Sequence, residues 1–275
     1  MTATSLATIG LSVVLSSVTA LAQERPYFVT YDDQLAKPRE LELSALSTMG
    51  TAKDGGSRYV APWIELEYGV TSRWTAELYL ESATYRGDGS AFTGWRLENR
   101  VRPFKGDHAV NPVLYVEYED VTEASRIQKE IVGRGPLPNE PIAVLDKEHE
   151  HEIEGRLILS SWVRRWNVSE NLIVEKNLSE NEGVEFGYAV GVSRPLAEPD
   201  VTCRLCAGAL TIGVEMYGGL GSTSGDADAA TRQFVAPILR WQVTRGGQFR
   251  ASVAFGLTTT SDRALLRLGY TIEVW

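Results

Sequence analysis

The sequence predicts an all-β protein: a single antiparallel, up-and-down transmembrane β-barrel of about twelve strands, within a range of about ten to fourteen. Three observations predict this fold. Apolar and polar residues alternate in one segment after another, and no helical period lasts for more than about a turn. The alternating runs are also long enough to cross a bilayer at a tilt, whereas strands of a water-soluble sandwich are usually about five or six residues long.

The composition excludes several classes of protein. The chain has 275 residues, with 27 Lys and Arg against 36 Asp and Glu, which gives a net charge of −9. A surface this acidic argues against nucleic acid as a partner, because phosphate binding needs a basic face. Only 3 His and 2 Cys are present, so neither a disulfide-dense scaffold nor a large metal cluster is expected, and we expect no cofactor.

The first 22 residues are predicted to be a signal peptide. Residues 6–22 read LATIGLSVVLSSVTALA, an apolar run that ends in Ala-Leu-Ala before Gln23. No Lys or Arg precedes this run, which is a departure from the usual pattern. A buried N-terminal helix is the alternative. With cleavage, the mature barrel domain covers residues 23–275 and is exported to the periplasm.

Twelve segments of the mature chain have strand character, and turn-forming sequences such as Arg86-Gly87-Asp88-Gly89 separate them. Alternation is weaker in 40–48, 150–163 and 171–178 than elsewhere. The segments are 40–48, 63–70, 74–81, 95–102, 113–120, 150–163, 171–178, 184–193, 210–217, 235–243, 249–257 and 266–274.

The ends of these segments carry aromatic residues typical of a membrane interface. All seven Trp fall near segment ends, which resembles an aromatic girdle: Trp63, Trp74, Trp95, Trp162, Trp166, Trp241 and Trp275. The C-terminal sequence LLRLGYTIEVW resembles the C-terminal signal of bacterial outer-membrane proteins, although Trp275 is one step out of phase with Val274 and Ile272. A water-soluble periplasmic β-barrel that binds a ligand is the alternative, because its strands alternate too.

An even number of strands places both ends of the barrel domain on the periplasmic side. Segments 121–149 and 218–232 are then expected outside the cell, and the short links 69–73, 104–111 and 244–248 in the periplasm. The link 194–209 is an exception, since it is both long and periplasmic.

Several strand segments resemble a known family. They are Ala61–Thr71, Trp74–Leu80, Asn171–Lys176 and Phe186–Val192. These stretches are similar to the outer-membrane β-barrel family annotated "MetA-pathway of phenol degradation", a family of outer-membrane transporters. The resemblance implies an outer-membrane barrel with a transport role, and it supplies no catalytic residues.

The polar face of the predicted strands is rich in charge and would line the lumen. Acidic residues concentrate on the early strands, and arginines on the fourth strand and the last three. One interpretation is a pore with an acidic and a basic wall; the other is a network of Arg–Glu ion pairs that blocks a narrow interior. The predicted lumen residues are Arg96, Arg100, Arg102, Arg240, Arg250, Arg267, Glu65, Glu67, Glu77 and Glu117.

Arg240, Arg250 and Arg267 are expected side by side on three consecutive strands, with Glu215, Glu40 and Glu42 as the acids available to neutralise them. If these acids do not suffice, the arginines form a wall that attracts organic anions, because guanidinium groups bind carboxylates and phosphates well.

Two short motifs could carry other chemistry. Cys203 and Cys206 form a C-x-x-C pair for which a local disulfide is expected in an oxidising periplasm, with redox exchange or metal capture as alternatives. Ala207 rather than His follows, so haem attachment is excluded. His149 and His151 would point the same way on a strand and are weak candidates for metal binding. The alternative is that they belong to a charged, solvated end of a loop.

These patterns together predict a bacterial outer-membrane protein that is not an enzyme, since no His-x-Ser of the kind expected for a barrel phospholipase occurs. The predicted function is a narrow channel or transporter for small solutes, anionic solutes included. The alternatives are a structural barrel with a salt-bridged, blocked lumen and the soluble ligand-binding barrel. Expected partners are outer-membrane lipid, a small-molecule solute and the barrel-assembly machinery, and the expected state is a monomer.

Overall fold

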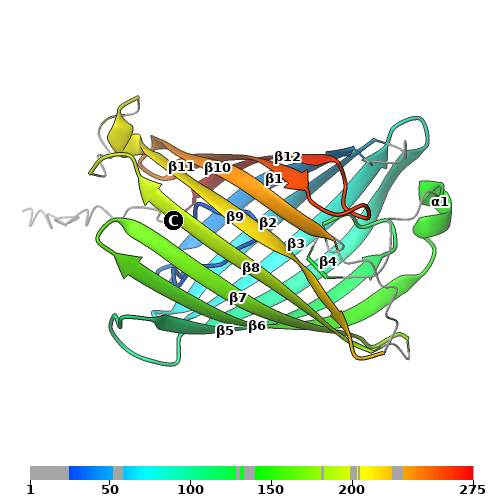
Figure 1. The fold of residues 1–275 in the computed structure, drawn as a ribbon, viewed down its shortest axis with the longest axis horizontal. Helices are drawn as coiled ribbons and strands as arrows, with labels where there is room; N and C mark the ends of the chain where they lie inside the picture. The colour runs from blue at the N-terminus through cyan, green and yellow to red at the C-terminus, as the bar shows by residue number, and fades with distance from the viewer. Residues whose placement is uncertain are drawn as a thin grey trace, which may run out of the picture.

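A computed structural model describes residues 25–51, 58–127, 131–132, 140–180, 183–198, 203, 205–224 and 232–274. These residues form a closed antiparallel barrel in which each strand pairs with its neighbours in sequence and the first pairs with the last (Figure 1). The predicted up-and-down barrel is therefore confirmed. Its strands are β1 (Leu41–Thr51), β2 (Tyr59–Thr71), β3 (Trp74–Tyr85), β4 (Gly89–Val101), β5 (Asn111–Thr122), β6 (His149–Val163), β7 (Trp166–Asn177), β8 (Val184–Pro195), β9 (Leu210–Ser222), β10 (Gln233–Thr244), β11 (Gly247–Gly256) and β12 (Ala264–Glu273).

The two ends of the barrel differ. At the end where β1 begins and β12 ends, which we call the turn end, two-residue links at 72–73, 164–165 and 245–246 join neighbouring strands. At the opposite end, which we call the loop end, the long connection between β5 and β6 carries the short helix α1 (Ile142–Leu145), which packs on β4. The 3-10 turn η2 (Ala207–Ala209) precedes β9 at the turn end. No helix in the described part of the chain is long and apolar enough to cross a membrane.

Alternation sorts the side chains of the barrel wall into two environments. Charged and polar side chains point inward and are buried, whereas the apolar residues between them point outward. Leu114, Val116, Leu172 and Phe255 are each at least 50% exposed on the outer face. A continuous apolar outer surface favours contact with lipid and argues against the water-soluble alternative, since soluble proteins rarely expose such a surface.

Two of the tryptophans do not belong to the expected aromatic girdle. Trp63 is buried inside the barrel, where its indole N–H donates to Glu65 Oε1 at 2.8 Å. Trp162 lies at the inner edge of the turn end and donates to Asp33 Oδ1 at 3.0 Å. Strand parity explains both corrections, because each Trp is an even number of residues away from an inward-facing side chain. Trp275 lies outside the described residues, as do residues 1–22 of the predicted signal peptide.

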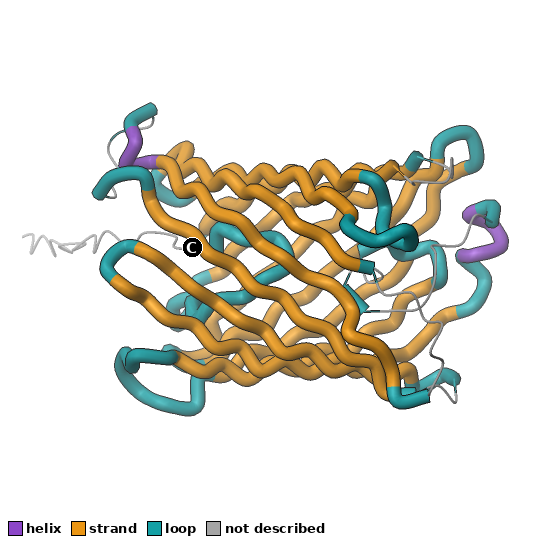
Figure 2. Tube along the Cα trace, viewed as in Figure 1, coloured by secondary structure: helices purple, strands orange, loops and turns teal. Residues whose placement is uncertain are grey.

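The barrel is not empty. Residues 25–40, which we call the inner segment, run through the interior before β1 begins, as the loop-coloured trace inside the strands indicates in Figure 2. Residues 123–127 and 131–132, which we call the inner loop, follow β5 and fold back into the barrel from the loop end. Together they bring apolar residues such as Val29, Ala124 and Val132 into an interior core.

Candidate functional site

The predicted lumen residues lie inside the barrel or at its mouth. Arg240 is half-buried. Arg102 follows the last residue of β4 and lies at the mouth of the turn end, where it contacts Asp33 and Asp107, so its expected place on a lumen strand is corrected. The other eight are buried inside: Arg96, Arg100, Arg250, Arg267, Glu65, Glu67, Glu77 and Glu117.

Arginines on β4 neutralise much of the acidic wall. The Arg100 guanidinium forms ion pairs with Glu67 at 2.8 Å, Glu77 at 3.0 Å and Glu98 at 2.6 Å. Arg96 lies four residues before Arg100 on the same strand and points inward too. It pairs with Glu81 at 2.5 Å and with Glu117 at 3.2 Å. Buried charges of this density require such partners, because an isolated ion away from water is strongly disfavoured. The paired-charge interpretation therefore describes the β2–β5 side of the wall.

The arginines on the last three strands have a different environment. Arg240 lies directly opposite Arg250 across β10 and β11, whereas Arg267 is opposite Ser252, so only two of the three are in register. Arg250 donates to the Tyr27 carbonyl at 3.0 Å and lies 3.9 Å from Glu65. Arg240 contacts the side-chain oxygens of Gln248 and Thr211, each at 3.4 Å.

Glu215 on β9 has a different role from the one expected of it. Its carboxylate accepts hydrogen bonds from three consecutive backbone N–H groups of the inner segment, at Phe28 (3.3 Å), Val29 (3.0 Å) and Thr30 (3.0 Å). A carboxylate that accepts several N–H groups is strongly held, because each bond is charge-assisted. Glu215 therefore binds the inner segment and is not the counter-ion of the arginine wall.

Other wall side chains bind the backbone of the inner segment in the same manner. Asn171 accepts from the Tyr31 N–H at 2.7 Å and donates to the Tyr31 carbonyl at 2.8 Å, as a neighbouring strand would. Arg156 donates to the Val29 carbonyl at 3.2 Å, and Arg100 to the Gln34 carbonyl at 3.4 Å. The inner segment thus has its polar backbone satisfied by wall side chains along its length.

Two tyrosines anchor the inner segment. The Tyr27 hydroxyl donates to Asn167 Oδ1 at 2.8 Å and lies 3.0 Å from the Ser193 hydroxyl. Its ring lies so close to Gly191 that a Cβ there would come within 2.8 Å of three ring atoms. The Tyr31 hydroxyl donates to Glu98 at 2.6 Å and lies 2.9 Å from the Tyr79 hydroxyl. Gly191 therefore provides the space that the Tyr27 ring occupies.

The inner segment ends in a tight turn at the turn end. Arg39 has a positive φ of 70°, and its N–H donates to the Gly69 carbonyl at 2.7 Å. A Cβ on Gly69 would lie 1.9 Å from the Lys37 carbonyl oxygen, so glycine is needed there. Within the segment, burial raises the pKa of Asp32 to about 6, against the lowering effect of a hydrogen bond from the Gln34 N–H.

The inner loop is held mainly by side chains. The Arg126 guanidinium lies over the rings of Tyr85 and Tyr59, 4.6 Å and 5.3 Å from their centroids. The Ser125 hydroxyl donates to Glu81 at 2.9 Å, and the Tyr85 hydroxyl to the Ala124 carbonyl at 2.9 Å. These contacts hold the inner loop inside the barrel near the loop end.

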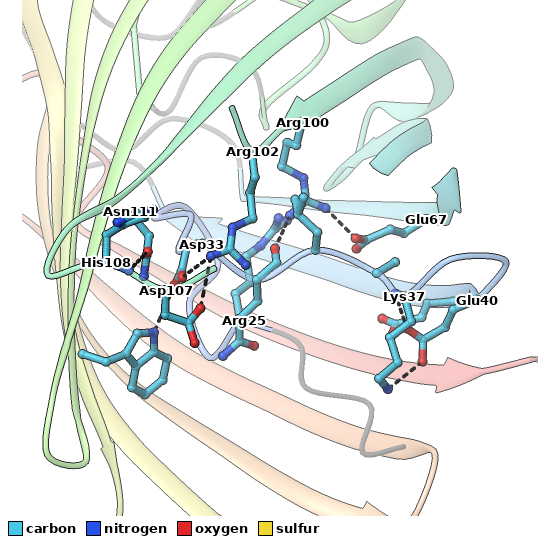
Figure 3. A pocket seen from close by; sticks show the side chains of 15 residues that line it. Arg25, Asp33, Lys37, Glu40, Glu67, Arg100, Arg102, Asp107, His108 and Asn111 are labelled. Carbon is cyan, nitrogen blue, oxygen red and sulfur yellow. Dashed lines mark hydrogen bonds and ion pairs between the residues drawn. The ribbon is translucent and has the colours of Figure 1, made fainter. Parts of the chain in front are cut away.

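Two cavities lie beside the inner segment. The larger, about 500 Å³, opens at the turn end and is lined by both charge signs, including Arg25, Lys37, Asp33, Glu40 and Arg102 (Figure 3). The smaller, about 50 Å³, lies between the inner segment and the inner loop. Among the described residues, the two inserted segments occupy much of the space between the charged walls.

The Cys and His motifs lie apart from the interior. Cys203 and Cys206 are both thiols in this structure, with the Cys206 thiol 3.6 Å from the Cys203 carbonyl, and their disulfide stays a prediction. His149 and His151 point outward near the loop end, on the same face as Asp120. His149 Nδ1 is 2.6 Å from the Asp120 carboxylate, whereas His151 Nδ1 is 2.9 Å from the Tyr118 hydroxyl and 4.0 Å from Asp120.

Alternation does not identify the segment that fills the barrel. Tyr27 and Tyr31 are central to the interior, yet both precede the first predicted strand. A signal was present: residues 27–31 read YFVTY, which is too apolar for an exposed tail between a cleavage site and a strand. The inner loop had no comparable signal, because its short apolar stretch lies within a long, charged connection.

Comparison with solved structures gives the fold an independent reference. The outer membrane channel COG4313 from Pseudomonas putida F1 superposes with a TM-score of 0.58 at 13% identity, covering 90% of this chain and 100% of that one. This is the fold of an outer-membrane channel. The NanC porin superposes with a TM-score of 0.52 at 10% identity, covering 85% of this chain and 100% of that one. At such identities the likeness concerns the fold alone.

The sequence matches no protein-family model and none of the curated proteins. The expected resemblance to the MetA-pathway family therefore stays a prediction.

Proposed function

We propose that this protein is a channel of the bacterial outer membrane for small polar solutes, and that the inner segment closes it in the state described here. The observation that carries the proposal is how the inner segment is bound. Its backbone is held by hydrogen bonds from side chains of a charged wall, above all from Glu215, Asn171 and Arg250. Water or a polar solute satisfies the same groups, so the segment is replaceable.

The inner segment also has an exit that needs little rearrangement. It begins inside the barrel, and its other end is fixed at the turn end by the Arg39–Gly69 contact. The cavity of about 500 Å³ lies beside it at that end. Movement of the segment past this cavity and out of the turn end would leave the strands and their register unchanged.

Electrophysiology tests the proposal directly. We expect the mature protein to show a low conductance with brief openings in planar bilayers, and a variant that lacks residues 25–36 to show a conductance several times larger and long-lived. Heat-modifiable gel mobility establishes that both barrels are folded. A folded deletion variant that does not conduct would contradict the channel and favour the alternative, a structural barrel.

The structural-barrel alternative has its own support, because two inserted segments and the ion pairs of Arg96 and Arg100 fill the interior. The inner loop is the feature that favours it, since that loop stays in place when the inner segment is deleted. Conductance of the deletion variant separates the two functions.

Anionic solutes are the proposed preference. Arg240 and Arg250 face each other on the β10–β11 side. In contrast, Glu77, Glu81 and Glu117 pair with arginines of β4. In the deletion background, replacing both with Gln should lower the anion-over-cation permeability ratio severalfold, because two guanidinium charges leave the pathway. Reversal potentials in a salt gradient measure this ratio, and Arg86→Gln, on the connection between β3 and β4, is the matched control. An unchanged ratio would remove the arginine wall from the mechanism.

We also propose the outer membrane as the location, outer-membrane lipid and the barrel-assembly machinery as partners, and a monomer as the working state. The apolar outer face and the fold support these proposals. The loop end would face the exterior and the turn end the periplasm, as short periplasmic turns are typical of such barrels. A channel function requires no catalytic residues.

A further inference from the structure

Three acidic side chains on adjacent strands converge inside the barrel near the loop end. Glu119 on β5, Glu152 on β6 and Glu175 on β7 each place a carboxylate oxygen within 4.8 Å of the other two. Glu119 is directly opposite Glu152 in the register, and Glu175 lies opposite the neighbouring Glu154. All three are at least nine-tenths buried.

Glu119 carries a buried oxygen that lacks a partner. Its Oε2 accepts no hydrogen bond from the described residues, although the side chain is only 2% exposed. The same side chain lines the cavity of about 50 Å³ between the inner segment and the inner loop. A buried carboxylate oxygen without a donor is costly, so it indicates a missing ligand beside Glu119.

The nearest arginines are engaged with other carboxylates. Arg96 pairs with Glu81 and Glu117, and Arg156 pairs with Glu154 and donates to the Val29 carbonyl. Arg267 and Arg25 line the small cavity from other sides. Neither Arg96 nor Arg156 therefore forms an ion pair with Glu119 or Glu175, whose carboxylates lie close together.

The donor set selects the class of ligand. Carboxylate oxygens bind hard cations. Ca²⁺ accepts oxygen ligands in flexible geometry and completes its coordination with water, whereas Mg²⁺ demands near-ideal octahedral coordination. Three carboxylates that come from three separate strands thus suit Ca²⁺.

We propose that Glu119, Glu152 and Glu175 form a Ca²⁺ site that ties β5, β6 and β7 together beneath the inner loop. The site is independent of solute passage, because it lies on one side of the wall and uses none of the groups that bind the inner segment through its backbone. Bound Ca²⁺ would neutralise the clustered charge and stabilise the wall from which the inner loop departs.

Equilibrium dialysis with ⁴⁵Ca²⁺ tests the site on the folded mature protein in detergent, stripped with a chelator and studied in about 0.15 M KCl. We expect one Ca²⁺ per barrel, weak competition by Mg²⁺, and an affinity at least about tenfold lower in Glu119→Gln and in Glu175→Gln, since each loses a charged ligand. Glu42→Gln, which alters a buried glutamate near the turn end, is the matched control and should bind like the wild type.

Absence of saturable ⁴⁵Ca²⁺ binding by the wild type would overturn the proposal, whatever the variants do. So would wild-type affinity in a folded Glu119→Gln/Glu175→Gln double variant. Because Gln removes repulsion between carboxylates, we expect the variants to fold, and heat-modifiable mobility checks this. The thermal unfolding temperature gives a second measurement: Ca²⁺ should raise it in the wild type and in Glu42→Gln but not in the double variant. None of these results depends on conductance.

Discussion

The two segments that fill the barrel are held by different kinds of contact. Along its backbone the inner segment is bound by Glu215, Asn171 and Arg156, which hydrogen-bond its N–H and carbonyl groups, and two tyrosine side chains anchor it in addition. The inner loop is bound mostly through its side chains, with Arg126 stacked on two tyrosines and Ile127 and Ile131 packed against the core. The difference shows that side chains of the barrel wall hold the inner segment, whereas side chains of the inner loop itself hold the inner loop.

This contrast has a consequence for function. Backbone contacts with charged side chains exchange readily for contacts with water, whereas stacked and apolar contacts are lost outright when a segment leaves the core. We therefore expect the inner segment to move first and the inner loop to stay. Changes at the wall should act on the inner segment, and changes within the loop should act on the loop alone.

The largest effect is expected from Glu215→Ala. Three backbone N–H groups lose a charged acceptor, and one bond of this kind contributes about 1.5–3 kcal/mol. Water replaces part of the lost acceptor, so we expect a net loss of about one such bond, which raises the open probability in planar bilayers about a hundredfold. Ser252→Ala, on the inner wall of β11, is the control, since its hydroxyl donates to the Pro237 carbonyl instead. An open probability equal to that of the control would mean that Glu215 does not hold the segment.

A second large effect is expected from Gly191→Leu. Any side chain there overlaps the Tyr27 ring, so the tyrosine must leave its site and lose its bonds to Asn167 and Ser193. Openings should become tens of times more frequent. Gly155→Ala is a matched control because its Cβ meets Val174 at an ordinary 3.4 Å. Closure that persists in a folded Gly191→Leu barrel would show that Tyr27 is not an anchor.

A smaller effect is expected from pH. The pKa of Asp32 in the closed state is about 6, raised by burial, whereas in water it is 3.8. The closed state therefore binds the proton more tightly, so closure is strongest below about pH 4 and weakens as the pH rises to about 6. Asp33 raises this pKa, and Arg25 and Arg100 lower it.

Open probability should thus increase about tenfold between about pH 4 and pH 7. This increase is smaller than the whole difference between the two pKa values of Asp32 would give, because Asp32 stays near charged groups after the inner segment leaves its site. Asp32→Asn should reduce this increase, and single-channel recordings over this range measure both. A variant with the wild-type pH profile would assign the dependence to other carboxylates of the wall.

The smallest effect concerns the inner loop. Arg126→Gln removes two cation–π contacts, worth about 1 kcal/mol, and should speed hydrogen exchange of the Ser125 amide about fivefold. The Tyr31 amide, which donates to Asn171, should be unaffected. In Glu215→Ala we expect the opposite: hydrogen exchange should become faster at the Val29 and Thr30 amides and stay unchanged at the Ser125 amide. Equal changes in both segments would mean that the two move as one unit.

Much of the fold could be predicted because period-two alternation is a local property. An inward Glu117 between outward Val116 and Tyr118 needs only the pleat of one strand, and the same reasoning gives twelve strands joined in sequence order. Alternation also places eight of the ten predicted lumen residues inside. It does not decide where a strand ends, and so Arg102 was assigned to the lumen although it lies at the mouth.

The register between strands and the identity of the segment inside the barrel are not local properties, since both depend on residues far apart in the chain. The sequence determined which side chains face inward, because neighbouring residues alone set the parity of a strand. Only the tertiary structure decided that Arg240 meets Arg250 while Arg267 does not, and that Glu215 binds residues 28–30 almost two hundred positions away. A closed barrel creates an interior that every strand shares, and the segment that fills it is chosen by the sum of those contacts and not by any local pattern.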